Sequence, residues 1–150
     1  MVAPDRVAGI VLIGSKAAVR RDPNSRDQAV RVLIDDGVDA AFTACWRPLF
    51  GQQTAPEVLC AARESAVAIG AAWLADGVRA FHDRPDRAAA LAATGVPILV
   101  INGDQDRPQA GAAMAATSRT ASFAVMEDCG HYPPLERPHE LARLIQQVIN

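Results

Sequence analysis

Three short apolar runs constrain what this chain can fold into. They are VAGIVLIG at 7–14, VPILVING at 96–103 and SFAVME at 122–127. The first two are continuously apolar and rich in β-branched residues, which is typical of strands covered on both faces of a parallel sheet. The alanine-rich stretch 108–118 lies between the second run and the third, and it predicts a short crossover helix. The pattern therefore favours an α/β fold with about three parallel strands.

An amphipathic helix is predicted after the third run. Pro138 and Glu140 suit its first turn. Its apolar side chains recur at the spacing of one helical face: Leu141, Leu144, Ile145, Val148 and Ile149. Residues 93–150 are thus expected to form a βαβα core unit, and residues 1–19 the first core strand and its exit.

The stretch 20–92 has a different pattern, with several helix signals and no strand-like run, and it is predicted to be a helical cap. Ser25 with Gln28, and Thr54 with Glu57, have the spacing of capping boxes. A continuous apolar helical face is expected from Ala66 to Phe81, ended by Pro85. Four aromatic side chains of this region are candidates either for an apolar substrate pocket or for simple packing: Trp46, Phe50, Trp73 and Phe81.

Composition bounds the class of protein. The chain has 150 residues, which is the length of one domain, and 50% of them are hydrophobic. Its net charge of −2 gives no electrostatic preference for nucleic acid or an anionic membrane. The chain has three cysteines, Cys45, Cys60 and Cys129. An odd number argues against a disulfide framework, and their spacing is not that of zinc ligands. Asp5 precedes the first apolar run and Lys16 follows it, the reverse of a signal peptide. We expect a cytoplasmic protein with no cofactor, metal, nucleic-acid or membrane partner.

Polar side chains follow two of the predicted strands. Asp104 and Asp106 come directly after 96–103, and His131 follows 122–127. Side chains from neighbouring loops converge at the carboxyl ends of parallel strands. An acid and a histidine placed there can meet as an orienting carboxylate and an imidazole. We therefore predict that Asp106 and His131 point at each other.

Other polar residues have simpler interpretations. Asp104 is read as a turn residue, and Cys129 as a small buried residue rather than a nucleophile. Ser15 is read as a turn or helix-start residue. His82 and His139 are read as solvated.

The segments PILVINGDQD and GHYPPLERPHEL resemble the last third of the α/β-hydrolase family. In that family the acid follows the seventh strand in a G-x-x-D pattern, the histidine follows the eighth, and a helical cap follows the sixth. Gly103 and Asp106 fit G-x-x-D, so the resemblance implies Asp106 rather than Asp104 as the acid. The residues that fit the histidine loop are Gly130, His131, Pro133, Glu136 and Pro138. Glu136 is expected to tie down this loop through backbone amides.

The resemblance extends over essentially the whole chain. The opening PDRVAGIVLIG is similar to the sixth strand, and WRPLF and GVRAFHD are similar to the small cap of the enol-lactonase-like branch. It implies a partial α/β-hydrolase fold with strands equivalent to 6–8. The family's sixth strand pairs with a fifth strand, so we expect 7–14 to be an edge open to a complementing chain or to self-association.

The same resemblance implies a nucleophile in a G-x-S-x-G elbow after the fifth strand. None of the five serines of this chain has those glycines, and neither does any Asp or Cys. Asp106 and His131 are therefore expected to serve a serine that is not on this chain.

The sequence is compatible with two functions. The first is the carboxyl-terminal portion of a serine hydrolase that acts on a small ester or lactone. The same fold also allows haloperoxidase-like activity or hydrolysis of a carbon–carbon bond. It further allows a dehalogenase or an epoxide hydrolase, in which the nucleophile is an Asp. The second is an inactive remnant or an interaction module that uses its exposed sheet edge.

Overall fold

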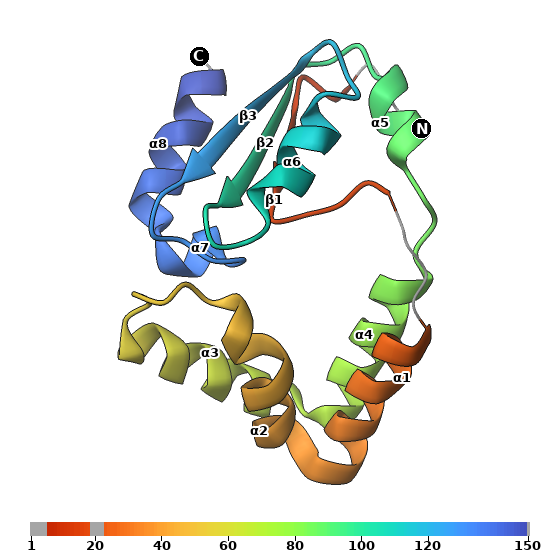
Figure 1. The fold of residues 1–150 in the computed structure, drawn as a ribbon, viewed down its shortest axis with the longest axis vertical. Helices are drawn as coiled ribbons and strands as arrows, with labels where there is room; N and C mark the ends of the chain where they lie inside the picture. Colours follow the sequence, from red (N-terminus) through yellow and green to blue (C-terminus); the bar gives the residue numbers. More distant parts are fainter. Residues whose placement is uncertain (1–5, 19–22, 150) are drawn as a thin grey trace. The chain divides into compact units, whose positions relative to one another are not determined.

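Three parallel strands form one sheet in the computed structural model, which describes residues 6–18 and 23–149. The strands are β1 (Ile10–Ile13), β2 (Ile98–Gly103) and β3 (Ala121–Met126), in the order β1-β2-β3 (Figure 1). Ile98 is the register partner of both Ile10 and Ala121. Every residue of β2 is buried. The three apolar runs therefore form the three parallel strands that the sequence predicts, and within the described residues β1 has only one neighbour.

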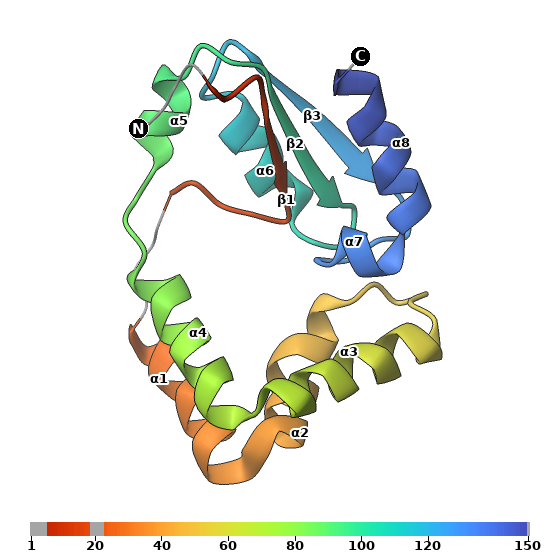
Figure 2. The same ribbon diagram turned by 180° about the vertical axis from the view of Figure 1, so that it is seen from behind.

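Two helices pack on opposite faces of this sheet because successive side chains of β2 point to opposite sides. Ile98 and Val100 pack with Ala115 of α6 (Pro108–Ala115). Leu99 and Ile101 pack with Leu141 of α8 (Pro138–Ile149). Helix α6 lies in front of the strands in Figure 1 and behind them in Figure 2. Two further short helices, α5 (Ala88–Ala93) and α7 (Pro133–Glu136), complete this part of the chain.

The chain divides into two compact units. The first unit contains the sheet and its helices, together with Gly51–Gln53. The second unit, Val19–Phe50 and Thr54–Pro85, is helical in its described residues and buries a cluster of Leu33, Ala41 and Ala75. Its elements are α1 (Pro23–Arg31), η2 (Val32–Asp36), α2 (Gly37–Ala41), η3 (Phe42–Trp46), η4 (Arg47–Leu49), α3 (Pro56–Ile69) and α4 (Ala71–Asp83).

Both capping boxes predicted in this helical unit are displaced from the helix starts. Helix α1 begins at Pro23, two residues before Ser25. Helix α3 begins at Pro56, so its N-cap is Ala55 rather than Thr54. Pro56 suits the start of α3 because its fixed φ and missing N–H fit the first helical turn.

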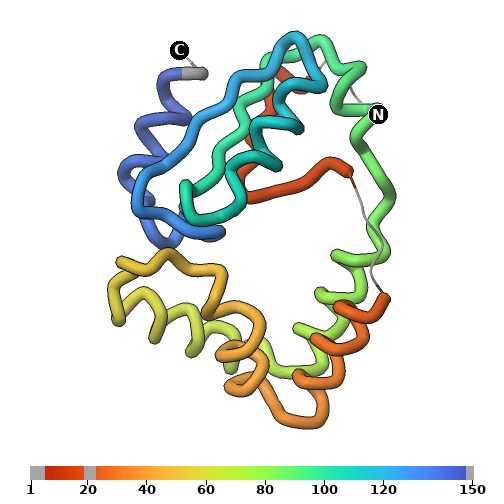
Figure 3. Tube along the Cα trace, in the orientation of Figure 1, coloured from red at the N-terminus to blue at the C-terminus, as the bar shows by residue number. Residues whose placement is uncertain are grey.

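The continuous helix predicted across 66–81 is also wrong. The chain breaks at Gly70, which has φ 86°, and α3 and α4 are bent by 98° (Figure 3). A side chain rarely adopts this left-handed φ, whereas glycine does so without a Cβ penalty. Among the described residues no single helix is long and apolar enough to cross a membrane, and only the bent pair α3 and α4 reaches that length and composition together.

Candidate active site

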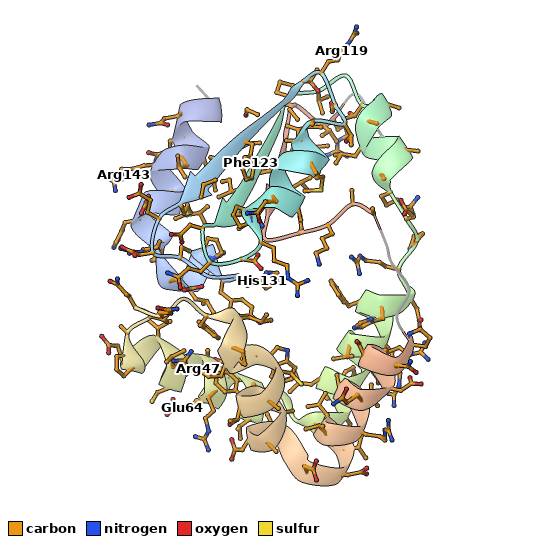
Figure 4. The ribbon with its side chains drawn as sticks, viewed as in Figure 1. Arg47, Glu64, Arg119, Phe123, His131 and Arg143 are labelled. Carbon is orange, nitrogen blue, oxygen red and sulfur yellow. The ribbon has the colours of Figure 1, made fainter. Side chains whose placement is uncertain are left out.

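The carboxyl ends of the strands bring an acid and a histidine into contact. Asp106 lies in the loop between β2 and α6. His131 lies in the loop between β3 and α7 (Figure 4). Asp106 Oδ2 is 2.7 Å from His131 Nδ1. Both side chains are partly buried, with exposed fractions of 16% and 32%. The predicted meeting of the two side chains is thus observed, while their catalytic role stays a prediction.

The imidazole lies over the carboxyl end of β1. A Cβ placed on Gly14 would be 3.3 Å from His131 Nδ1 and 3.4 Å from Cε1. The ring of Tyr132 packs edge-on against His131, with the ring centroids 5.1 Å apart. Burial, with the nearby carboxylate of Asp106, raises the pKa of Tyr132 to about 12. Tyr132 is therefore a neutral neighbour of the imidazole over the physiological pH range.

The histidine loop is anchored by one carboxylate. Glu136 Oε2 accepts hydrogen bonds from the backbone N–H of Gly51 at 2.8 Å and of Gly130 at 3.0 Å. Its Oε1 accepts a third from the N–H of Tyr132 at 3.0 Å. Gly130 and Tyr132 are the residues on either side of His131, so Glu136 fixes the backbone on both sides of the base. This confirms that Glu136 ties down the loop.

The acid loop is tied to the histidine loop by short contacts. Asp104 Oδ1 accepts a hydrogen bond from the N–H of Cys129 at 3.0 Å, so Asp104 is more than a turn residue. The N–H of Gln105 donates to the carbonyl oxygen of Cys129 at 3.0 Å. A Cβ on Gly103 would overlap the carbonyl oxygens of Cys129 and Gly130, so only glycine allows the two loops to approach this closely.

Cys129 is a core residue, as its interpretation from the sequence required. It is fully buried and packs with Met126 and Leu141. Burial, reinforced by the charge of Glu136, raises the pKa of the Cys129 thiol to about 12. Because the thiolate is the nucleophilic form, this cysteine is unreactive at neutral pH.

Within the described residues, no serine hydroxyl forms a hydrogen bond with His131. Ser65 Oγ donates to Ala61 O within α3. Ser122 Oγ donates to Ile98 O, at the amino ends of the strands and away from the histidine. Ser15 follows the end of β1, and its Oγ is buried with no hydrogen-bond partner among the described residues. Those residues also contain no group of three or more His, Cys, Asp or Glu side chains that could hold a metal ion.

The four candidate aromatic residues separate into two pairs. Trp46 and Phe50 both pack against Phe42. The ring centroid of Phe42 is 6.5 Å from that of Trp46 and 6.2 Å from that of Phe50. Trp73 and Phe81 lie on α4 with exposed fractions of 76% and 57%. The first pair therefore belongs to the packing of the helical unit, and the second pair is on its surface. Whether any of the four contacts a substrate stays a prediction.

Sequence reasoning missed two features next to the pair. Asn102 is a buried amide on β2 whose Nδ2 lies 3.3 Å from Asp106 Oδ2. The only sequence signal for Asn102 is that it is a polar residue at the end of an apolar run. The second feature is Gly51–Gln53, whose backbone binds Glu136 and, through the N–H of Gln52, the side chain of Gln105 at 2.8 Å. No local pattern marks contacts between segments so far apart in the sequence.

Comparison with known proteins identifies the fold. Residues 1–144 match the alpha/beta hydrolase family. No curated protein matches this chain. Among solved structures, a thermophilic esterase from Thermogutta terrifontis is 26% identical with a TM-score of 0.86, covering 97% of this chain and 57% of its own.

Two further structures show the same fold at lower identity. The enol-lactonase from Burkholderia xenovorans is 23% identical with a TM-score of 0.81, over 97% of this chain and 57% of its own. An esterase from Exiguobacterium antarcticum is 16% identical with a TM-score of 0.80, over 96% and 58%. This chain thus spans somewhat more than half the length of the structures it matches. The chain belongs to the alpha/beta hydrolase family.

Proposed function

We propose that this chain supplies the acid and the general base of a serine hydrolase that acts on esters or lactones. The observation that carries the proposal is the 2.7 Å contact between Asp106 Oδ2 and His131 Nδ1. With Nδ1–H donating to the carboxylate, the other ring nitrogen, Nε2, carries the lone pair. Nε2 can then take the proton of a serine hydroxyl as its oxygen attacks the carbonyl carbon, and return that proton to the leaving alcohol.

Asp106 has two roles in this proposal. It fixes the ring orientation and the tautomer of His131, and it stabilises the positive charge that forms on the imidazole when the proton arrives. The partial burial of both side chains supports these roles, because a charge interaction is stronger away from bulk water.

The attacking serine comes from a segment other than these 150 residues. No serine of the chain has the glycine-flanked pattern, and the buried Ser15 hydroxyl makes no hydrogen bond to His131. A longer form of the protein or a complementing polypeptide would supply the nucleophile. The likeness to the thermophilic esterase, and more weakly in identity to the enol-lactonase, supports an ester or lactone as the substrate.

A chimera tests this function. The carboxyl-terminal region of the Thermogutta terrifontis esterase that corresponds to this chain would be replaced by the chain, leaving the esterase to provide the remaining sheet. We expect a chimera that unfolds cooperatively to hydrolyse p-nitrophenyl acetate. His131→Ala and Asp106→Asn should each reduce kcat by about 10⁴-fold or more, as loss of a triad member does.

His139→Ala is the matched control, because this histidine lies in the first turn of α8 and outside the proposed site. A folded chimera that keeps its rate after His131→Ala would contradict the assignment. On the chain alone, a fluorophosphonate probe should attach to no serine. Efficient labelling that disappears in Ser15→Ala would place the nucleophile on this chain instead.

A second candidate function rests on the edge of β1. The N–H groups of Ile10 and Gly14 donate to Pro97 O and Ile101 O of the β2 side. By the two-residue period of a strand, the backbone groups of Val11 and Ile13 point to the open edge. Such an edge can bind a strand of a second copy or of another protein.

Light scattering across protein concentrations tests this edge. Association of the wild-type chain should disappear in Val11→Pro, which removes an outward N–H while keeping the bonds to β2. A chain that stays monomeric at all concentrations contradicts self-association through β1.

A further inference from the structure

The strand that carries the acid also carries one buried polar side chain. Asn102 is 5% exposed, whereas the preceding residues of β2, from Ile98 to Ile101, are apolar and at most 4% exposed. Burying an amide costs free energy unless hydrogen bonds replace its contacts with water. The hydrogen-bond partners of Asn102 therefore indicate why a polar side chain stands at this buried position.

One end of this amide faces the acid. Asn102 Nδ2 lies 3.3 Å from Asp106 Oδ2 and 3.3 Å from the backbone oxygen of Asp106. Asp106 Oδ2 is also the oxygen that contacts His131 Nδ1. The amide orientation follows from these neighbours, because the opposite orientation would set the amide oxygen against two other oxygens.

The other end of the amide has no hydrogen bond. Asn102 Oδ1 is buried and without a partner among the described residues. It faces α6 where a Cβ on Gly111 would overlap it, and Phe123 lies beside the same position. Burying this oxygen without a hydrogen bond costs free energy, so an apolar side chain here removes that penalty together with the two weak contacts of Nδ2. The benefit of Asn102 is thus to be sought at Asp106 rather than in the stability of the sheet.

We propose that Asn102 is a positioning residue for the acid–histidine pair. Its Nδ2 donates to the oxygen of Asp106 that accepts from His131, which fixes the carboxylate rotamer and keeps Oδ2 directed at the imidazole. The backbone contact at Asp106 O anchors the same turn. This inference rests on the proposed function only for its catalytic consequence, because the geometry of the pair can be measured without any reaction.

The test compares Asn102→Val with Val100→Ala on the 150-residue chain. Val100 is fully buried, lies two residues earlier on the same face of β2 and packs with Ala115 of α6. Two quantities are measured for each variant: the exchange rate of the His131 Nδ1 proton by NMR, and the unfolding temperature. Asn102→Ala, which is too small to clash with Gly111, replaces the valine variant if that one does not fold.

We expect Asn102→Val to accelerate exchange of the Nδ1 proton about tenfold, the effect of losing one weak hydrogen bond to a charged group. Its unfolding temperature should stay the same or rise. Val100→Ala should lower the unfolding temperature and leave exchange unchanged. Wild-type exchange in folded Asn102→Val and Asn102→Ala would overturn the inference. An inactive chimera with a wild-type pair would instead contradict the proposed hydrolase function and leave this result untouched.

Discussion

Replacement of Glu136 tests how firmly the histidine loop is held. The carboxylate accepts from three backbone amides, two at Oε2 and one at Oε1. Glu136→Gln keeps the shape of the side chain but leaves one acceptor oxygen. If that oxygen stays with Gly51 and Gly130, the new NH₂ group faces the N–H of Tyr132, and a hydrogen bond becomes a contact between two donors.

The expected loss follows from these three contacts. A hydrogen bond to a charged group contributes roughly 1.5–3 kcal/mol, and its neutral counterpart about half of that. Losing one of these hydrogen bonds and weakening the other two would lower the unfolding free energy by the sum of these amounts if the loop were dry. The loop is partly open to water, which can bind the freed amide and reduce this loss. We therefore expect Glu136→Gln to cost about 2 kcal/mol and Glu136→Ala about 3–4 kcal/mol of unfolding free energy. For a chain of this length each kcal/mol corresponds to about 2–4 °C in Tm.

Thermal unfolding followed by circular dichroism measures this loss. The matched control is Glu127→Gln, which removes the same charge from an exposed side chain just after β3. That control should change stability by less than about 0.5 kcal/mol. If Glu136→Gln unfolds within about 1 °C of Glu127→Gln, the three amide contacts do not stabilise the loop.

Three further expectations concern the loops beside the pair. Because burial raises the pKa of Cys129 to about 12, iodoacetamide at pH 8 should modify exposed Cys60 and spare Cys129 until the chain unfolds; mass spectrometry decides, and equal labelling contradicts the burial. An unfolded cysteine ionises near pH 8.5 while folded Cys129 keeps its proton, so stability should fall between about pH 9 and 12, and less steeply in Cys129→Ala. Gly103→Ala should cost about 3 kcal/mol through overlap with two carbonyl oxygens, and denaturant unfolding like that of the wild type would contradict this.

The sheet and the acid–histidine contact could be predicted because their signals are local and mutually consistent. Three apolar runs bounded by glycine or polar residues predict the strands, and the parallel order of those strands brings the loops after β2 and β3 together. Once both loops lie at the same end of the sheet, few arrangements separate Asp106 from His131. The 2.7 Å contact is thus a consequence of topology as much as of the two residues.

The helical unit was less predictable because its breaks depend on backbone conformation. The apolar period continues through Gly70, so the pattern alone predicts one helix, whereas the left-handed φ of this residue bends the chain by 98°. A glycine within a periodic run permits a bend without requiring it. Similarly, Ser25 and Thr54 have capping-box spacing, but Ser25 lies within α1 and the N-cap of α3 is Ala55.

The contacts around the pair come from the two loops and from β2. Glu136 fixes the backbone on both sides of His131, and Asp104 joins the acid loop to Cys129. Asn102 faces the acid from the strand itself. Each of these partners lies on this chain, so residues of this chain orient the imidazole. In the proposed hydrolase, a complementing segment would add the serine hydroxyl near Nε2 and the donors of the oxyanion hole, while the entropy of ordering the acid and the base is already lost on folding.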